Sequence, residues 1–389
     1  MVDLLVISHA CFMGINRNVY RLFKSDGWQV ELVVPKYLQF PSGQREAEPA
    51  REDDPPIHYL TLNGVNPRTY EYDGLMDLLD RVKPGLILLD NDPVSRLALQ
   101  VGKWTKDHGA KLFCISCENL PLGLRATLRR RGWKSAPAAL IKRLLLYRTK
   151  KVVDGVFTIN TDGKQIFTDE GYRYVERIPL GFDPSVFYVD GDVRAALREK
   201  RGLKHPVIAY FGRLTREKGV HILISALKDL QQYNWQLMMD DFDEYASGYN
   251  KEVYDMMKQA GILERVVFIS PNHFEIAAYM NAADIVVVPS IAAPHWKEQY
   301  GRVAAEAMAC GRLVIASDSG SLPELLNNHG LLFPEGDVAG LRKLIERLLT
   351  GNFSEITVPS GQEAAVYADL SLSINRQKEI MTASFELLK

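Results

Sequence analysis

Pro206-Val-Ile-Ala-Tyr-Phe-Gly212 is an apolar run that ends in glycine, and it predicts a buried β-strand followed by a turn. A helical pattern starts at about Gly219. Further apolar runs follow at 235–240, 266–270 and 285–289. Strands without polar alternation, separated by helices, are typical of a parallel sheet that is covered on both faces. Residues from 206 onward therefore predict one doubly wound α/β domain.

The N-terminal half carries an earlier series of the same kind. Leu4-Leu-Val-Ile-Ser8 predicts a first strand, which a turn at Gly14, a helix and a second strand at 30–35 follow. Similar runs occur at 85–90, 111–116 and 155–159. Residues 39–56, rich in Pro, Glu and Arg, predict a loop. The sequence thus predicts two doubly wound parallel sheets in tandem.

The length of 389 residues also favours two domains, because a single core rarely grows beyond roughly 250–300 residues. Ile178-Pro-Leu-Gly-Phe-Asp-Pro184 holds two prolines and a glycine and is the best linker candidate. We predict an N-terminal domain over 1–183, a C-terminal domain over 184–361, and a helix over 362–389 that packs back on the first domain.

Bulk composition narrows the class of protein. Hydrophobic residues make up 47% and charged residues 24%, which excludes a disordered or fibrous chain. The net charge of −1 gives no global field toward nucleic acid, so no nucleic-acid partner is expected. Four cysteines form no disulfide framework, and a basic-then-apolar leader is absent from the N-terminus. We expect a cytoplasmic protein, with at most peripheral contact at the inner face of the membrane.

The strongest motif is Ser290 followed by Glu298-Gln-Tyr-Gly301-Arg-Val-Ala-Ala-Glu306, in which two glutamates stand eight positions apart. Gly301 suits a loop tip, and the alanine-rich segment from Arg302 to Cys310 predicts a short helix. The amide groups at a helix N-terminus and the positive end of its dipole attract phosphate and sugar oxygens. The motif therefore predicts an anion or sugar site in front of this helix.

The two glutamates resemble the Glu-x7-Glu motif of family 4 glycosyltransferases. The resemblance extends to Gly212-Arg213-Leu-Thr-Arg-Glu-Lys218-Gly219 and to Ser317-Asp-Ser-Gly-Ser-Leu-Pro-Glu324, and it is dense from 206 to 337. It implies the GT-B fold, in which two Rossmann-like domains face each other across a cleft. It also implies retaining transfer of a hexose-type sugar from a nucleoside-diphosphate sugar to a hydroxyl acceptor, in polysaccharide or glycolipid assembly.

Site residues follow from this resemblance, position by position. Arg213 and Lys218 would hold the diphosphate and stabilise its growing charge, Glu298 would bind hydroxyls of the transferred sugar, and Glu306 would bind the ribose. The remaining donor-binding candidates are Gly14, Gly212, Ser290, Tyr300, Gly301 and Arg302. With two cations at the diphosphate, neither a metal nor another cofactor is expected.

The N-terminal half departs from the family. Where a His-Asp pair is usual, this chain reads Ser116-Cys-Glu118-Asn119, and the usual double glycine near the N-terminus is reduced to Gly14. Glu118, Asn119 and His9 are therefore the candidates for contact with the sugar or with a saccharide or lipid-linked acceptor. Two alternatives stay open. A GT-B sugar-nucleotide epimerase shares the two-domain cleft and binds the same diphosphate, and a non-catalytic nucleotide-sugar-binding protein is suggested by the missing histidine and the altered glycine turns.

Two motifs suggest metal chemistry. Asp241-Phe-Asp243 resembles the Asp-x-Asp metal motif of the other large glycosyltransferase fold, although acidic loops are more often simply solvated. Cys114-Ile-Ser-Cys117 has no second Cys or His pair at zinc spacing. Neither outweighs the expectation of a metal-free site.

A basic segment lies between Asn119 and Val153, where no acidic residue occurs. Its cations are Arg125, Arg129, Arg130, Arg131, Lys134, Lys142, Arg143, Arg148, Lys150 and Lys151. Leucines and a tryptophan are interleaved with them, so residues 125–151 predict peripheral contact with an anionic membrane. A solvated helix face remains the alternative.

Overall fold

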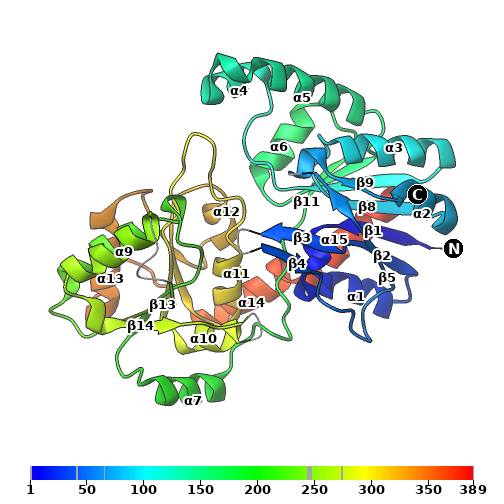
Figure 1. Cartoon of the computed structure of the whole chain (residues 1–389). Coiled ribbons are helices and arrows are strands. Elements are labelled where there is room, and N and C mark those ends of the chain that lie inside the picture. The colour runs from blue at the N-terminus through cyan, green and yellow to red at the C-terminus, as the bar shows by residue number, and fades with distance from the viewer. Residues whose placement is uncertain (1, 41–42, 65, 243–247, 273–274, 389) are drawn as a thin grey trace. The chain divides into compact units, whose positions relative to one another are not determined.

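The computed structural model describes residues 2–40, 43–64, 66–242, 248–272 and 275–388, except for the side chain of Arg131. The chain forms two compact units. The N-terminal unit comprises residues 1–181 and 374–389, and the C-terminal unit comprises residues 182–373. The boundary falls inside the predicted linker at 178–184, two residues before the predicted domain limit. Each unit has its own sheet and core (Figure 1).

The sheet of the N-terminal unit has seven parallel strands in the order β11-β10-β9-β8-β1-β2-β5. The strands are β1 (Leu4–Ser8), β2 (Val30–Pro35), β5 (Ile57–Leu60), β8 (Leu86–Asp90), β9 (Lys111–Ser116), β10 (Gly155–Thr158) and β11 (Val175–Arg177). Strand order reverses between β1 and β8, because the chain first adds β2 and β5 on one side of β1 and then β8 on the other. In open α/β sheets, ligands bind beyond the carboxyl ends of the strands at such a point.

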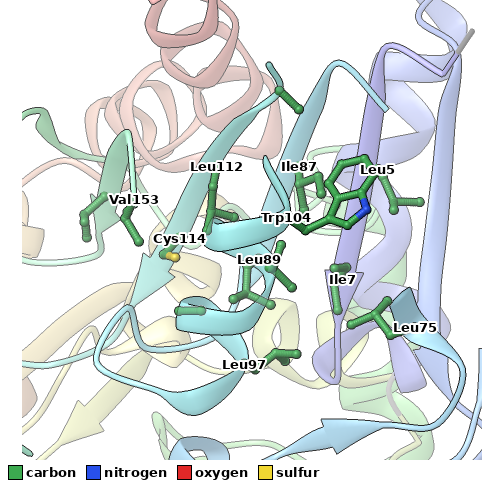
Figure 2. Packing of buried hydrophobic residues seen from close by; sticks show 14 of the residues in the cluster. Leu5, Ile7, Leu75, Ile87, Leu89, Leu97, Trp104, Leu112, Cys114 and Val153 are labelled. Carbon is green, nitrogen blue, oxygen red and sulfur yellow. The ribbon is translucent and has the colours of Figure 1, made fainter. Parts of the chain in front are cut away.

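Helices cover both faces of this sheet (Figure 1). The helices of this unit are α1 (Asn18–Ser25), α2 (Leu75–Val82), α3 (Arg96–His108), α4 (Leu124–Arg131), α5 (Ala136–Thr149), α6 (Thr161–Asp169) and α15 (Ile374–Leu387). On one face, strand residues such as Ile87 and Leu112 pack against Leu97 and Trp104 of α3 (Figure 2). On the other face, Phe113 and Phe157 lie against Phe385 of α15. The alternation places successive strand residues in opposite cores.

The C-terminal unit has a second parallel sheet, in the order β14-β13-β12-β15-β16-β17. Its strands are β12 (Val207–Tyr210), β13 (Gln236–Asp240), β14 (Val266–Ile269), β15 (Ile285–Val288), β16 (Leu313–Ser317) and β17 (Leu331–Phe333). Its helices are α7 (Gly191–Arg201), α8 (Val220–Leu227), α9 (Tyr249–Gln259), α10 (Ile276–Ala282), α11 (Arg302–Ala309), α12 (Leu322–Leu326), α13 (Val338–Thr350) and α14 (Gly361–Leu372). Strand order reverses between β12 and β15. The predicted fold class, two Rossmann-like doubly wound parallel sheets, is confirmed.

The prediction of one C-terminal helix over 362–389 is wrong. Ser373 is extended, with ψ 165°, and separates α14 from α15. The backbone of Ser373 pairs with Phe182, and its hydroxyl donates to the carbonyl of Asp369. Helix α14 belongs to the C-terminal unit, where it packs on α11, while α15 packs on α1 in the N-terminal unit. No glycine or proline marks this break, which a tertiary contact imposes.

The predicted loop at 39–56 is partly structured. Strands β3 (Tyr37–Phe40) and β4 (Gly43–Glu46) pair as an antiparallel hairpin. After the hairpin, Asp54 accepts a hydrogen bond from the fully buried guanidinium of Arg17 at 3.0 Å. Arg17 also donates to the carbonyl oxygens of Glu48 and Pro49. A buried guanidinium needs such acceptors, and they hold this segment against the unit.

Candidate functional site

The donor-side candidates lie where the strand order of the C-terminal unit reverses. Strands β12 and β15 are paired neighbours, and Gly212 and Arg213 follow β12 while Ser290 follows β15. These residues therefore share the carboxyl edge of the sheet, which is the usual ligand position in this architecture. Glu298 lies between β15 and α11, so the same edge carries the predicted glutamate.

Glu298 is the centre of a polar network. Its side chain is buried, with the residue 5% exposed, and Oε2 lies 2.7 Å from Nζ of Lys218. The same oxygen accepts a hydrogen bond from the buried hydroxyl of Ser290, also at 2.7 Å. The ammonium of Lys218 lies 5.2 Å from the ring centroid of Trp296. A buried carboxylate needs such partners to remain ionised.

Close backbone approaches fix the two loops that carry this network. Lys218 ends the short helix η5 (Arg216–Lys218), and Gly219 follows with φ 70°. A Cβ on Gly219 would lie 1.8 Å from the carbonyl oxygen of Pro289, so only glycine lets the loops meet. The amide of Ile291 donates to the carbonyl of Glu217 at 2.8 Å. Lys218 is thereby held beside the segment that leads to Glu298.

Helix α11 begins next to the network. Gly301 precedes the helix with φ 92° and, as a glycine, has no side chain with which to cap the first amides. Its first amides thus keep their capacity to bind oxygens. Tyr300 is buried and Arg302 is exposed. One turn into the helix, burial raises the pKa of Glu306 to about 7, and the positive charge of Arg302 opposes that rise.

Arg213 differs from Lys218 in having its charge at the surface. Its side chain is exposed and forms no ion pair within the part of the chain that the structure describes. Its carbonyl oxygen accepts a hydrogen bond from the hydroxyl of Tyr210 at 3.0 Å. Nearby, burial raises the pKa of Asp240, and the backbone amide of Gly212 partly offsets that rise. The structure thus brings Lys218, Glu298 and Ser290 into contact, and it leaves the guanidinium of Arg213 solvated.

The remaining candidates belong to the N-terminal unit, at the carboxyl edge of its own sheet. His9 follows β1, and its ring meets Tyr70 edge-on at 5.4 Å. Glu118 follows β9 and pairs with Arg68 at 3.2 Å, while Asn119 is buried. They lie beyond strands β1 and β9, which flank β8.

Gly14 is also in the N-terminal unit, and its amide hydrogen is already used. The amide donates to Oε2 of Glu48 at 2.7 Å, and a Cβ on Gly14 would lie 2.8 Å from that oxygen. A carboxylate thus occupies the position at which we expected an oxygen of the donor. Glu48 is 34 positions from Gly14 in the sequence, so the residues next to Gly14 could not indicate this contact.

The structure also places near the two sites several residues that the sequence did not predict. Trp296 contacts Lys218, and the hydroxyl of Ser319 is buried without a hydrogen-bond partner among the described residues. Ser319 lies within the 317–324 segment that resembles the family, and that was the available signal. In the N-terminal unit, Asp92 and Lys142 approach the Arg68–Glu118 pair. Their contacts join separate elements, so spacing in the sequence could not reveal them.

No group of three or more His, Cys, Asp or Glu side chains within the described residues could hold a metal ion. Asp241 is described, but Asp243 of the Asp-x-Asp motif lies outside the described residues. Cys114 is buried and Cys117 is exposed, and neither forms a disulfide. No helix in the described ranges is long and apolar enough to cross a bilayer. The expectation of a metal-free site stays a prediction.

Comparison with known sequences gives a family match for part of the chain. Residues 193–360 match the glycosyl transferases group 1 family. The chain is 30% identical over 237 residues to D-inositol 3-phosphate glycosyltransferase of Corynebacterium jeikeium, covering 56% of this chain and 55% of that protein. It is 32% identical over 202 residues to GDP-mannose-dependent alpha-(1-6)-phosphatidylinositol monomannoside mannosyltransferase of Mycolicibacterium smegmatis, covering 50% and 51%. The chain spans about half the length of the curated relatives it matches.

Solved structures share the fold over the whole chain. Anabaena HepE in complex with UDP is 19% identical, with a TM-score of 0.73 and coverage of 99% of this chain and 100% of that one. Sucrose-phosphate synthase from Thermosynechococcus elongatus is 19% identical, with a TM-score of 0.67 and coverage of 100% and 99%. Residues 193–360 thus resemble the group 1 glycosyl transferases, and the whole chain shares the fold of these solved glycosyltransferase structures.

Proposed function

We propose that the chain is a retaining, metal-independent glycosyltransferase. It transfers a hexose-type sugar from a nucleoside-diphosphate sugar to a hydroxyl acceptor in polysaccharide or glycolipid assembly. The observation that carries this proposal is the Lys218–Glu298–Ser290 network beside the start of α11, at the strand-order reversal of the C-terminal unit. UDP in the complex of Anabaena HepE and GDP-mannose in the name of the M. smegmatis relative support a sugar nucleotide as donor.

In this proposal the donor diphosphate lies at the N-terminus of α11, between that helix and the loop after β12. Arg213 and Lys218 provide positive charge there without a metal ion. The bond between the sugar C1 and the diphosphate oxygen breaks, and charge accumulates on that oxygen. Cations placed at the leaving group stabilise this transition state more than the bound donor, so they increase the rate. Arg213 is suited to this task because a solvated guanidinium can turn to a ligand.

The two glutamates hold the two sugars of the donor. Glu298, pinned by Lys218 and Ser290, accepts hydrogen bonds from hydroxyls of the transferred hexose. Glu306, inside the first turns of α11, accepts them from the ribose. The acceptor hydroxyl attacks C1 from the side on which the diphosphate leaves, and its proton passes to the departing phosphate oxygen. Bonds form and break on one face of the sugar, which retains the configuration at C1.

We further propose that the N-terminal unit binds the acceptor and docks on an anionic membrane, at its cytoplasmic face. Sixteen large hydrophobic side chains are exposed in the described chain, and six of them belong to 124–147. These are Leu124, Trp133, Leu140, Ile141, Leu144 and Tyr147. Trp133 is 79% and Ile141 67% exposed. Apolar side chains among cations, with no acidic residue, fit a surface of anionic lipid.

One experiment tests the proposed activity. Purified protein is incubated with UDP-, GDP-, ADP- and dTDP-sugars in chelator, after thermal shift has identified the donor that binds. Release of the nucleoside diphosphate with retained anomeric configuration in the product supports the proposal. Epimerisation of the donor sugar, or binding without turnover, would contradict it in favour of the epimerase or the binding protein. The variant Arg213→Met/Lys218→Met should have no detectable transfer, and a rate close to that of the unaltered protein would remove the assignment.

A further inference from the structure

Two adjoining hollows lie on the surface of the C-terminal unit. One has a volume of about 640 Å³ and is lined by residues 327–330, 357–359 and Glu363. The other has a volume of about 480 Å³ and is lined by His329 and by residues of α14. His329 and Glu363 line both hollows, which therefore adjoin. Ligand pockets in proteins measure roughly 300–1,000 Å³, so this surface is large enough to hold a small ligand.

The hollows lie at the amino edge of the sheet, away from the candidate donor site. Residues 327–330 join the end of α12 to the start of β17, and residues 357–359 precede the start of α14. The donor-side candidates follow the carboxyl ends of β12 and β15, at the opposite edge of this parallel sheet. None of these candidates, all of which the structure describes, lines either hollow. A ligand bound here would occupy a separate site.

The wall formed by residues 327–330 contains two successive left-handed residues. Among the described residues other than glycine, three have a positive φ, and two of these are Asn327 (φ 41°) and Asn328 (φ 67°). One left-handed residue is an ordinary helix end, and Asn327 follows α12 in this role. A second left-handed residue adds a conformational cost that the helix end does not explain. Such strain is concentrated at binding sites, which makes the side chain of Asn328 a candidate ligand contact.

Two stacked rings give the hollows a flat apolar surface. The rings of His329 and Tyr367 lie face to face, with centroids 4.1 Å apart and 2° between their planes. The hydroxyl of Tyr367 donates to the carbonyl of Leu325 at 3.2 Å. Nδ1 of His329 donates to the carbonyl of Asn327 at 2.8 Å, so that Nε2 of the neutral ring can accept a hydrogen bond. Val366, which is 49% exposed, adds an apolar side chain beside the rings.

The polar lining combines donors and acceptors with little charge. The exposed amides of Asn327 and Asn328 each provide donors and an acceptor, and the hydroxyl of Thr357 provides both. Glu363 brings the one fixed charge, since neither lysine nor arginine occurs among the described residues that line the hollows. A phosphate here would meet a carboxylate without a neighbouring cation, which is unfavourable. The lining therefore fits an uncharged ligand that carries several hydroxyl groups.

We propose that these hollows bind a neutral saccharide through Asn328, Glu363 and the stacked ring pair. Neighbouring hydroxyls of a sugar ring each donate and accept, which matches an amide beside a carboxylate. The C–H face of the sugar packs on a flat ring and on Val366. This inference goes beyond the proposed function, because the hollows share no residue with the candidate donor site. The C-terminal unit thereby holds a glycan at a place where no bond is made or broken.

The test is saturation-transfer NMR of the full chain with three neutral probes, maltotriose, mannotriose and galactotriose. Asn328→Gly removes the amide while the backbone keeps its left-handed conformation without strain. Binding should weaken by about fivefold, which is the effect of one lost hydrogen bond. The melting temperature should stay the same or rise, because glycine suits this position. An asparagine that served the turn alone would give the second effect without the first.

Two further variants sharpen the test. Lys83→Gly is the matched control, because Lys83 is the third left-handed residue (φ 48°) and lies in the N-terminal unit. It should leave saccharide affinity within about twofold of that of the unaltered protein. Glu363 also follows Ser360 as in a helix capping box, in which glutamine serves equally. Glu363→Gln should therefore keep α14 intact and weaken binding by about fivefold, because a carboxylate is the stronger acceptor.

The outcomes separate a saccharide from other ligands. Binding of at least one trisaccharide that weakens in Asn328→Gly and Glu363→Gln, but not in Lys83→Gly, supports the proposal. Absence of binding for all three probes, or equal affinities of Asn328→Gly and the unaltered protein, would overturn it. So would an Asn328-dependent preference for glucosamine or glucuronate over glucose, which would assign the hollows to a charged ligand. Failure of the sugar-nucleotide turnover assay would leave this result standing, because the two assays report on different sites.

Discussion

The Nζ atom of Lys218 lies 2.7 Å from Oε2 of Glu298, although eighty residues separate them in the chain. The pair joins the loop after β12 to the segment before α11. Because Glu298 is almost fully buried, this cation and the hydroxyl of Ser290 compensate the cost of removing its carboxylate from water. Lys218 therefore has two tasks in the proposed enzyme. It positions the carboxylate that binds the sugar, and it contributes charge at the diphosphate.

Lys218→Met should destabilise the protein as well as inactivate it. Removing the cation takes a counter-charge away from a buried carboxylate, which we expect to lower the free energy of unfolding by about 1–3 kcal/mol, given that Lys218 is 23% exposed. Lys218→Met/Glu298→Gln should recover most of that stability without recovering transfer. Urea unfolding measures the stability of both variants. The control is Lys343→Met, which breaks the exposed pair with Glu355 and should cost less than about 1 kcal/mol. Equal losses for Lys218→Met and Lys343→Met would contradict the positioning task.

Arg213→Met should leave stability unchanged and weaken donor binding. The guanidinium is solvated, so its loss should alter the free energy of unfolding by no more than about 0.5 kcal/mol. Loss of a charge-assisted contact with the diphosphate should weaken binding of the sugar nucleotide by about tenfold. Arg216→Met, three residues away, breaks the exposed pair with Glu252 and the contact with the ring of Tyr249, and it serves as the control in calorimetry. Similar donor affinities in the two variants would exclude Arg213 from the diphosphate site.

Gly219→Ala should disrupt the site through the backbone. At φ 70° an L side chain is strained, and the added Cβ would lie 1.8 Å from the carbonyl oxygen of Pro289. Gly351→Ala is the matched control, since Gly351 has φ 69° and nothing within 4 Å of its Cβ position. The control should cost about 1–2 kcal/mol for the conformation alone. Gly219→Ala should cost clearly more in urea unfolding and should lower donor affinity, because Lys218 must shift. Equal costs would show that the two loops can move apart freely.

Donor binding should depend on pH through Glu306. Its pKa, raised by burial to about 7, means that the carboxylate form grows from a small to a dominant fraction between pH 6 and pH 8. The ribose hydroxyls bind the carboxylate, so affinity for the sugar nucleotide should rise by about tenfold over this range. The diphosphate diester does not change its protonation between pH 6 and pH 8, so the change in affinity over this range reports on the glutamate. Calorimetry of Glu306→Gln should give weaker binding with a flat pH profile; a profile as steep as that of the unaltered protein would assign the proton to another group.

Glu306 should also make the free energy of unfolding depend on pH. A carboxyl whose pKa is raised in the folded state favours folding when protonated, so its contribution is fully present below the usual pKa of 4.5 and is lost as pH rises through about 7. Stability should therefore fall across this interval more in the unaltered protein than in Glu306→Gln. Urea midpoints at pH 5 and pH 8 measure the difference. No difference between the two proteins would mean that Glu306 is solvated enough to ionise normally.

The main strands could be predicted from sequence because parallel strands buried on both faces are continuous apolar runs. Strands β1 and β2 begin and end at the predicted residues. The hairpin of β3 and β4 escaped prediction because both strands are short and at least partly exposed, β4 is polar, and the two strands pair only with each other. The break at Ser373 escaped because a serine in an otherwise helical pattern has no local signature.

In the candidate site, too, local features could be predicted from the sequence, and contacts between distant segments could not. The start of α11 at Arg302 and the glycine before it could be predicted, since they are local features. That Lys218 holds Glu298, and that Glu48 holds the amide of Gly14, are contacts between distant segments that one sequence does not encode in its spacing.

Membrane docking should depend on the apolar side chains of α5. Leu140, Ile141 and Leu144 lie at helical spacing and are exposed, so burial in the headgroup region would remove their surface from water. The triple serine variant of these positions should weaken co-sedimentation with anionic vesicles at low salt by tenfold or more, at about 1 kcal/mol for each partly buried side chain. Val366→Ser/Leu370→Ser on α14 is the control, because it changes exposed apolar residues of the C-terminal unit. Binding should also weaken with added salt, since the basic side chains contribute through charge that salt screens. If the unaltered protein does not bind anionic vesicles at low salt, or if the α5 and α14 variants bind equally, the exposed face of α5 has another partner.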